Sequence, residues 1–128
     1  MSHIFPVHVY YEDTDLAGIV YHANYLRYIE RARTEWVRGL GVDQTLLKAR
    51  DGLVFAVCRV EADYIKAARF DEALQVHTTP LKNTGVRFVL QQDVRRDQTT
   101  LFQARVTIVA VRETGQPIRL PDALQRVL

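Results

Sequence analysis

Serine and cysteine are almost absent from this chain. Its 128 residues include one serine, Ser2, and one cysteine, Cys58. Ser2 stands at the start of the chain, which argues against a Ser-His-Asp hydrolase. Cys58 lies in an alternating apolar segment, where a cysteine is typically a small core residue rather than a nucleophile. We therefore expect any hydrolytic chemistry to use another group. A lone cysteine also rules out a disulfide framework and favours a reducing compartment.

Long hydrophobic runs and a strong net charge are missing too. No apolar run approaches the ~18 residues of a membrane span. The first residues, MSHIFPVH, lack the basic and apolar regions of a secretory signal. The net charge of +2 is too small, and the basic residues too dispersed, to indicate a nucleic-acid partner. These features predict a cytoplasmic protein without a transmembrane segment, and the length fits one domain spanning residues 1–128.

The apolar residues change their period along the chain. Alternation predicts a strand over residues 5–12, with Pro6 near an edge. From Ala23 to Leu40 the apolar residues follow helical spacing, and Gly41 is a suitable C-cap. Residues 42–50 predict a short second helix. Further strands are predicted at residues 54–65, 74–79, 86–94 and 101–112, with a turn at 80–85 and a short tail from 120.

This order of elements indicates an α+β fold. We expect one antiparallel five-stranded sheet wrapped around a long central helix. One helix cannot cover both faces of such a sheet, and its strands leave edges that can pair. The sequence therefore predicts a homo-oligomer, a dimer or a dimer of dimers.

A short acidic loop, Asp13-Thr14-Asp15, precedes the long helix. A helix N-terminus offers free backbone N–H donors, which can stabilise charge developing on a carbonyl oxygen. A neighbouring carboxylate can attack that carbonyl or deprotonate a water, and both roles stay open. Most Asp-x-Asp pairs before a helix only cap it or hold the loop. A calcium loop is excluded, because Ala17 and Asn24 occupy its fifth and twelfth positions.

The residues Tyr11, Asp13 to Asp15, Gly18 to Tyr21 and Tyr25 form one gapless motif. This motif resembles the hotdog-fold acyl-CoA thioesterases of the 4-hydroxybenzoyl-CoA type. The segment Glu30–Glu35, ERARTE, resembles the branch of that family associated with the Tol-Pal cell-envelope system. Weaker similarity continues over nearly the whole chain.

The resemblance implies an enzyme that hydrolyses a small acyl-CoA to a free acid and CoA, at sites on a subunit interface. Matched to the motif, Asp15 is the catalytic carboxylate, and a backbone N–H at or beside His22 polarises the thioester carbonyl. Asp13 is expected to hold the loop. No metal or other cofactor is expected. The further substrate-binding candidates are Gly18, Tyr21 and Asn24, with Lys82 and Arg87 for the CoA phosphates.

Several alternatives stay open. Glu35 is the second candidate for the catalytic carboxylate, since some hotdog thioesterases place theirs on the helix. The same fold could instead carry a hydratase or dehydratase acting on a thioester. A third hypothesis is that the protein is not an enzyme, and is instead an envelope-associated module or a module that binds an acyl carrier protein. Release of thiol from acyl-CoA would separate the first reading from the others.

Overall fold

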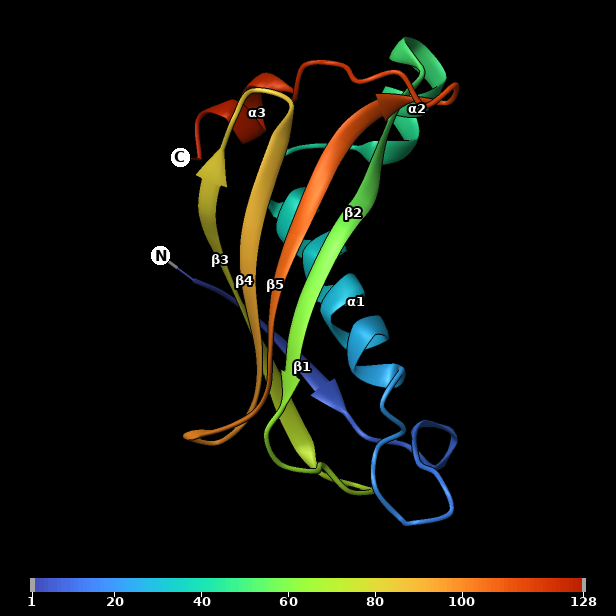
Figure 1. Cartoon of the computed structure of the whole chain (residues 1–128), viewed down its shortest axis with the longest axis vertical. Helices are drawn as coiled ribbons and strands as arrows, with labels where there is room; N and C mark the ends of the chain where they lie inside the picture. The colour runs from blue at the N-terminus through green and yellow to red at the C-terminus, as the bar shows by residue number, and fades with distance from the viewer. Residues whose placement is uncertain (1, 128) are drawn as a thin grey trace.

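The computed structural model describes residues 2–127, in which one long helix lies against one face of a curved five-stranded sheet (Figure 1). The strands and helices run in this order: β1 (His3–His8), the 3-10 turn η1 (Tyr11–Asp13), α1 (Asn24–Gly39), α2 (Gln44–Asp51), β2 (Leu53–Tyr64), β3 (Ala73–Asn83), β4 (Arg87–Arg96), β5 (Thr99–Arg112) and α3 (Asp122–Gln125). The expected α+β fold, with a five-stranded antiparallel sheet and one long helix, is confirmed.

The strand order in the sheet is β1-β3-β4-β5-β2, and every neighbouring pair is antiparallel. Strands β3, β4 and β5 form the centre as consecutive hairpins, and β1 and β2 occupy the two edges. The outer edge of β2 has no partner strand within residues 2–127. Within the same residues no helix is long and apolar enough to cross a membrane.

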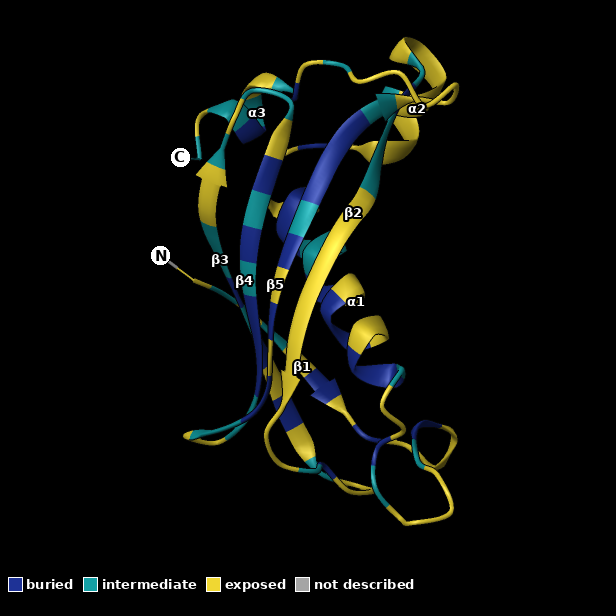
Figure 2. Ribbon diagram, viewed as in Figure 1, coloured by how far each residue is buried: buried dark blue, intermediate teal, exposed yellow. Residues whose placement is uncertain are grey.

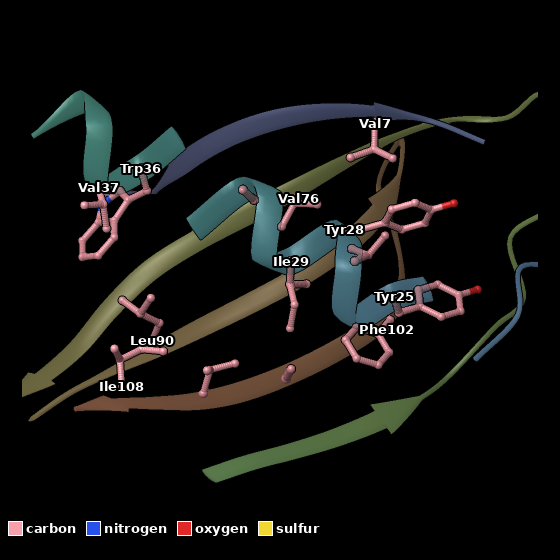
Figure 3. Close-up of a cluster of buried hydrophobic side chains, with 14 of the residues drawn as sticks. Val7, Tyr25, Tyr28, Ile29, Trp36, Val37, Val76, Leu90, Phe102 and Ile108 are labelled. Atoms are coloured by element: carbon pink, nitrogen blue, oxygen red, sulfur yellow. The ribbon is translucent and has the colours of Figure 1, made fainter. Parts of the chain in front are cut away.

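One apolar stripe of α1 holds the helix on the sheet (Figure 3). Tyr25, Ile29 and Trp36 lie on this stripe at helical spacing and are buried. They pack against alternate residues of the central strands, among them Leu90 and Phe102, which are fully buried. Because removal of apolar area from water stabilises the fold by about 25 cal/mol per Å², this contact is the main force that fixes α1.

A buried amide adds a polar tie between helix and sheet. Gln92 on β4 is fully buried. Its Nε2 donates to the Ile29 carbonyl and to Thr78 Oγ1, both at 2.9 Å, and its Oε1 accepts from Arg33 Nη1 at 3.0 Å. An unpaired buried amide costs roughly 1–3 kcal/mol, so these bonds favour one placement of α1 along β4.

Two sequence expectations are wrong, one about the burial of a side chain and one about the length of a strand. Cys58 was expected in the core, but it is exposed at a β-bulge between Val57 and Arg59. Its strand is an edge strand, and apolar alternation does not distinguish an edge from the centre of a sheet. The first strand was expected to continue to residue 12. It ends at His8, and the chain turns through η1, which leaves the Tyr11 side chain 79% exposed.

The end of β3 and the C-terminal tail also differ from expectation. A turn was predicted from Pro80, but β3 continues to Asn83, with a bulge between Pro80 and Lys82 that accommodates the proline. The tail forms the short helix α3, whose Gln125 Nε2 donates to the Gly85 carbonyl at 3.0 Å. The tail therefore covers the β3–β4 end of the sheet.

Candidate active site

Asp13 holds the loop between β1 and α1 in place. Its side chain is buried, and Oδ2 accepts from the Tyr10 N–H at 2.9 Å. Its backbone carbonyl accepts from the Tyr21 N–H at 2.8 Å and from Asn24 Nδ2 at 2.9 Å. These bonds join the two ends of the loop, so Asp13 is its structural carboxylate.

Asp15 lies on a tight turn within this loop, and its side chain is exposed. Its Oδ1 accepts from the Ala17 N–H at 2.9 Å, and its carbonyl accepts from the Gly18 N–H at 2.9 Å. Gly18 has a φ of +79°, a left-handed conformation that side chains disfavour. A Cβ at Gly18 would meet nothing within 4 Å, so the backbone conformation alone requires the glycine. The turn orients Asp15 and leaves Oδ2 without a partner in residues 2–127.

The start of α1 offers unused backbone donors. The helix begins at Asn24 after Ala23, which provides no side-chain cap. Tyr21 and Asn24 use their N–H groups within the loop, but those of His22 and Ala23 donate to no acceptor among the described residues. The positive end of the helix dipole lies at the same place. This arrangement favours an oxygen that carries or develops negative charge.

A cavity of about 360 Å³ brings these groups together. Its lining includes Asp15, Ile19, His22, Tyr25, Tyr64 and Lys66. Tyr64 Oη also donates to the His22 carbonyl at 2.9 Å, which holds the start of the helix beside β2. The carboxylate of Asp15 and the helix start therefore face one space.

The segment that follows β2, residues 65–72, forms the opposite wall and is called the β2–β3 strap below. The Ala68 N–H donates to Tyr25 Oη at 3.0 Å, and the Ala68 carbonyl accepts from the Val20 N–H at 2.8 Å. An isolated β-bridge joins Ile19 to Arg69. Burial raises the pKa of the Tyr25 hydroxyl, which keeps this buried acceptor neutral. One residue, Ala68, thus ties the strap to both the loop and α1.

The structure brings only some of the predicted site residues together. Asp15 and His22 line the same cavity. Gly18 forms the turn beside Asp15, and the Tyr21 ring lies 4.4 Å from that of His22. The Asn24 side chain is buried and donates to the Asp13 carbonyl, so it holds the loop.

The remaining candidates lie far from this cavity within the protomer. Lys82 and Arg87 lie near the β3–β4 turn, at the opposite end of the sheet (Figure 1). Glu35 is roughly 20 Å further along the helix axis than His22, at 1.5 Å per residue, and it pairs with Arg38. Sequence reasoning missed Tyr64 and Lys66, because only the fold brings the end of β2 and the strap beside the loop. The available signal was the weak similarity that continues from Val57 to Asp71.

Within residues 2–127, no three His, Cys, Asp or Glu side chains are arranged to hold a metal ion.

A family profile described as the thioesterase-like superfamily matches residues 9–128. The chain belongs to this superfamily. Two curated relatives in it are similar along most of their length. The acyl-CoA thioesterase YbgC of Haemophilus influenzae is 42% identical over 123 residues, which cover 94% of this chain and 90% of that protein. The acyl-CoA thioester hydrolase YbgC of Escherichia coli is 40% identical over 124 residues, covering 94% and 88%.

Two solved structures agree with the fold. The structure of a probable thioesterase from Bartonella henselae has a TM-score of 0.91 at 36% identity, covering 94% of this chain and 100% of that chain. A 4-hydroxybenzoyl-CoA thioesterase mutant in complex with 4-hydroxybenzoyl CoA has a TM-score of 0.92 at 20% identity, covering 99% of both chains. At that identity the second likeness concerns the fold alone. The hotdog fold expected from the loop motif is confirmed.

Proposed function

We propose that this thioesterase-like protein hydrolyses a small acyl-CoA to a free acid and CoA, as a single hotdog domain, with Asp15 and the helix start at His22 as its catalytic groups. One observation carries the assignment of the site: the exposed Asp15 carboxylate and the unused His22 N–H lie at one cavity, beside the positive end of α1. The relatives named acyl-CoA thioesterase and acyl-CoA thioester hydrolase, at 42% and 40% identity, support the reaction.

The chemistry follows from where charge develops. When the thioester carbonyl is attacked, its oxygen becomes negative. A positioned N–H donor at that oxygen is worth about 10²–10³ in rate. The N–H of His22 is the proposed donor, and the helix dipole adds to its effect.

Asp15 has two chemically complete routes. In the first, a carboxylate oxygen attacks the carbonyl carbon, the C–S bond breaks, and CoA leaves as a thiolate that takes up a proton. Water then hydrolyses the mixed anhydride and restores the carboxylate. In the second, Asp15 removes a proton from water as that water attacks the thioester directly. Oδ2 of Asp15 is available for either route.

A thiol-release assay with a panel of acyl-CoAs, from short aliphatic to aromatic, tests the proposal. We expect turnover of at least one member of the panel. A hydration assay on enoyl-CoA is the matched measurement for the hydratase alternative. Hydration without thiol release would contradict a thioesterase, and inactivity on every acyl-CoA would favour a non-catalytic binding module.

The proposed oligomer is a homodimer formed along β2, which can associate further into a tetramer. Strand β2 is exposed along most of its length (Figure 2). A groove between α1 and β2 is lined by exposed apolar side chains, Leu26, Val57 and Val60. It also contains Glu30 and Arg33, so a two-fold copy can place opposite charges across the interface.

Compartment and partners are proposals as well. A cytoplasmic location fits an exposed thiol at Cys58, which a reducing compartment preserves. The association with the Tol-Pal system rests on the resemblance of Glu30–Glu35 alone. An acyl carrier protein is the alternative acyl donor, since it presents the same thioester.

A further inference from the structure

The backbone carbonyl of His22, at the start of α1, is bound by a side chain of β2. In a regular α-helix a carbonyl accepts from the N–H four positions later. That N–H, of Leu26, donates instead to the Ala23 carbonyl at 3.2 Å. Tyr64 Oη takes its place and donates to the His22 carbonyl at 2.9 Å. The helix start therefore depends on one hydroxyl from the edge strand.

The ring of Tyr64 is held in place by two buried rings at the end of β2. Tyr64 pairs with Phe102 of β5, and their rings meet edge to face with centroids 5.0 Å apart. The Tyr25 ring is also edge to face with Tyr64, at 5.6 Å, and itself stacks on Phe102 (Figure 3). The next residue, Ile65, donates its N–H to the Leu101 carbonyl at 2.8 Å. These contacts fix the position from which the hydroxyl donates.

Hydrogen bonds restrain the peptide units on both sides of His22. The unit before it joins the N–H of His22 to the Tyr21 carbonyl, which accepts from the Asn24 N–H at 2.8 Å. The unit after it joins the N–H of Ala23 to the His22 carbonyl, which accepts from Tyr64. Because a peptide unit is planar, a bond at its carbonyl also restrains the direction of its N–H. Neither N–H has an acceptor within residues 2–127, so a substrate oxygen can use both.

The Tyr64 hydroxyl also strengthens the donor in the peptide unit that it binds. A carbonyl that accepts a hydrogen bond polarises its amide, so the N–H becomes a better donor by roughly 10–30%. The gain is largest when the acceptor becomes negative, which happens to the carbonyl oxygen in the transition state of thioester hydrolysis. The hydroxyl therefore affects the chemical step more than the binding of the substrate.

We propose that Tyr64 is a positioning residue for hydrolysis. Its hydroxyl acts on the reacting carbonyl through the His22–Ala23 peptide and does not contact that carbonyl itself. This inference rests on the proposed function, because it concerns the oxygen that the helix start binds in that reaction. Since Tyr64 lies on β2, it also connects the strand of the proposed dimer to the catalytic groups.

Removal of the hydroxyl alone tests the proposal. Tyr64→Phe keeps the ring that packs on Phe102, so we expect the variant to fold. With the acyl-CoA that the unmodified protein hydrolyses fastest, we expect kcat to fall about tenfold and KM to change less than about twofold. The matched control is Tyr10→Phe, which removes an exposed hydroxyl from the loop before α1 and should keep kcat within about twofold.

Two unreactive CoA analogues separate positioning from general binding. One is a ketone, in which a methylene replaces the thioester sulfur and the carbonyl is kept. The other is a thioether of the same length without a carbonyl. We expect Tyr64→Phe to weaken the ketone about threefold, within the range of one hydrogen bond, and to leave the thioether unaffected. The infrared band of the bound ketone carbonyl should move to higher frequency, because its hydrogen bonds are weaker.

Backbone relaxation of the free protein gives a test that needs no substrate. We expect ¹⁵N order parameters of about 0.85, typical of a rigid backbone, at the amides of His22 and Ala23. Tyr64→Phe should lower both values, and Tyr10→Phe should leave them as they are. Unchanged order parameters in Tyr64→Phe would overturn the inference, even if no acyl-CoA is hydrolysed.

Other results would also overturn it. A lower free energy of unfolding with an unchanged kcat would mean that the bond only stabilises the fold. A higher KM with an unchanged kcat would mean that Tyr64 contacts the substrate directly. Equal losses of kcat in Tyr64→Phe and Tyr10→Phe would mean a general disturbance of the loop. Failure of the proposed function has a separate signature, since the unmodified protein would then release no thiol, whatever its order parameters.

Discussion

Two aspartates in one loop have opposite surroundings. Asp13 is buried and accepts the Tyr10 N–H, while Asp15 is exposed and keeps one carboxylate oxygen without a partner. A buried, hydrogen-bonded carboxylate is suited to holding structure, and an accessible one is suited to meeting a substrate. The family resemblance assigns catalysis to Asp15 and the loop to Asp13, and the contacts of the two side chains give each assignment a physical basis.

This difference predicts how the two amide substitutions behave. We expect Asp15→Asn to lower kcat by about 10²–10⁴, since it removes the base or nucleophile, and to change KM little. Asp13→Asn should retain more activity and instead lower the free energy of unfolding by about 1–2 kcal/mol. Thiol-release kinetics and urea denaturation of both variants measure these effects. Near-normal turnover of Asp15→Asn, with loss in Glu35→Gln or His22→Ala, would assign the mechanism to those residues.

A buried tyrosine predicts sensitivity to alkali. Burial, and then the nearby Asp13 carboxylate, raise the pKa of the Tyr28 hydroxyl in the folded protein. Below about pH 10, the ordinary tyrosine pKa, the hydroxyl is neutral in both states and its contribution to stability is complete. Above that pH the unfolded chain loses the proton first, so the free energy of unfolding falls.

We therefore expect a decline in stability from about pH 10 upward that is less steep in Tyr28→Phe. Denaturant unfolding at several alkaline pH values measures it. The exposed residue Tyr10 supplies the control, Tyr10→Phe, which should leave the slope as it is. Identical slopes in all three proteins would contradict the role of Tyr28.

At the scale of elements, local patterns were predictable and long-range partners were not. The predicted helix, Ala23 to Leu40, is within one residue of α1 at each end, because its apolar stripe and Gly41 are encoded nearby. The continuation of β3 past Pro80 depends on a bulge that keeps β3 paired with the next strand, β4. The end of β1 at His8 depends on its pairing with β3, which is distant in sequence. The hydrogen bonds of Ala68 to Tyr25 and Val20 also join residues far apart in the sequence, so the residues around Ala68 could not predict them.

The Gln92 tie between β4 and α1 predicts a measurable loss of stability. Gln92→Leu retains the approximate volume but leaves Arg33 Nη1 and Thr78 Oγ1 without their bonds to the amide. We expect the free energy of unfolding to fall by roughly 2–3 kcal/mol. The control is Gln103→Leu at an exposed position, which should change it by less than about 0.5 kcal/mol. Equal urea midpoints for the two variants would contradict this account.

At the scale of the whole molecule, the unpaired edge of β2 predicts a dimer with its two-fold axis near Cys58. A strand that pairs antiparallel with its own copy brings the residues near its middle together. We expect light scattering to give a mass of at least about twice 14.8 kDa, because the dimer can associate further. Mild oxidation should give a covalent dimer that dithiothreitol reverses and that Cys58→Ser does not form.

A charge on that edge should separate the subunits. We expect Val60→Asp to give a monomer with little activity, because it places a charge in the proposed interface. Ile4→Asp introduces the same charge on β1, at the other edge of the sheet, and should keep the dimer. A fully active monomer would rule out the interface.

The strand order also sets the order in which this chain folds. Strands β3, β4 and β5 pair through short hairpins, whereas β1 pairs His3 with Thr78, and β2 pairs Tyr64 with Phe102. Closing long loops slows folding, since their entropy is lost before contacts compensate. We therefore expect the β3–β5 meander to form first and β1 and β2 to join it later. The loop that carries Asp15 connects β1 to α1, so it acquires its structure at a late step, when the chain closes its sheet.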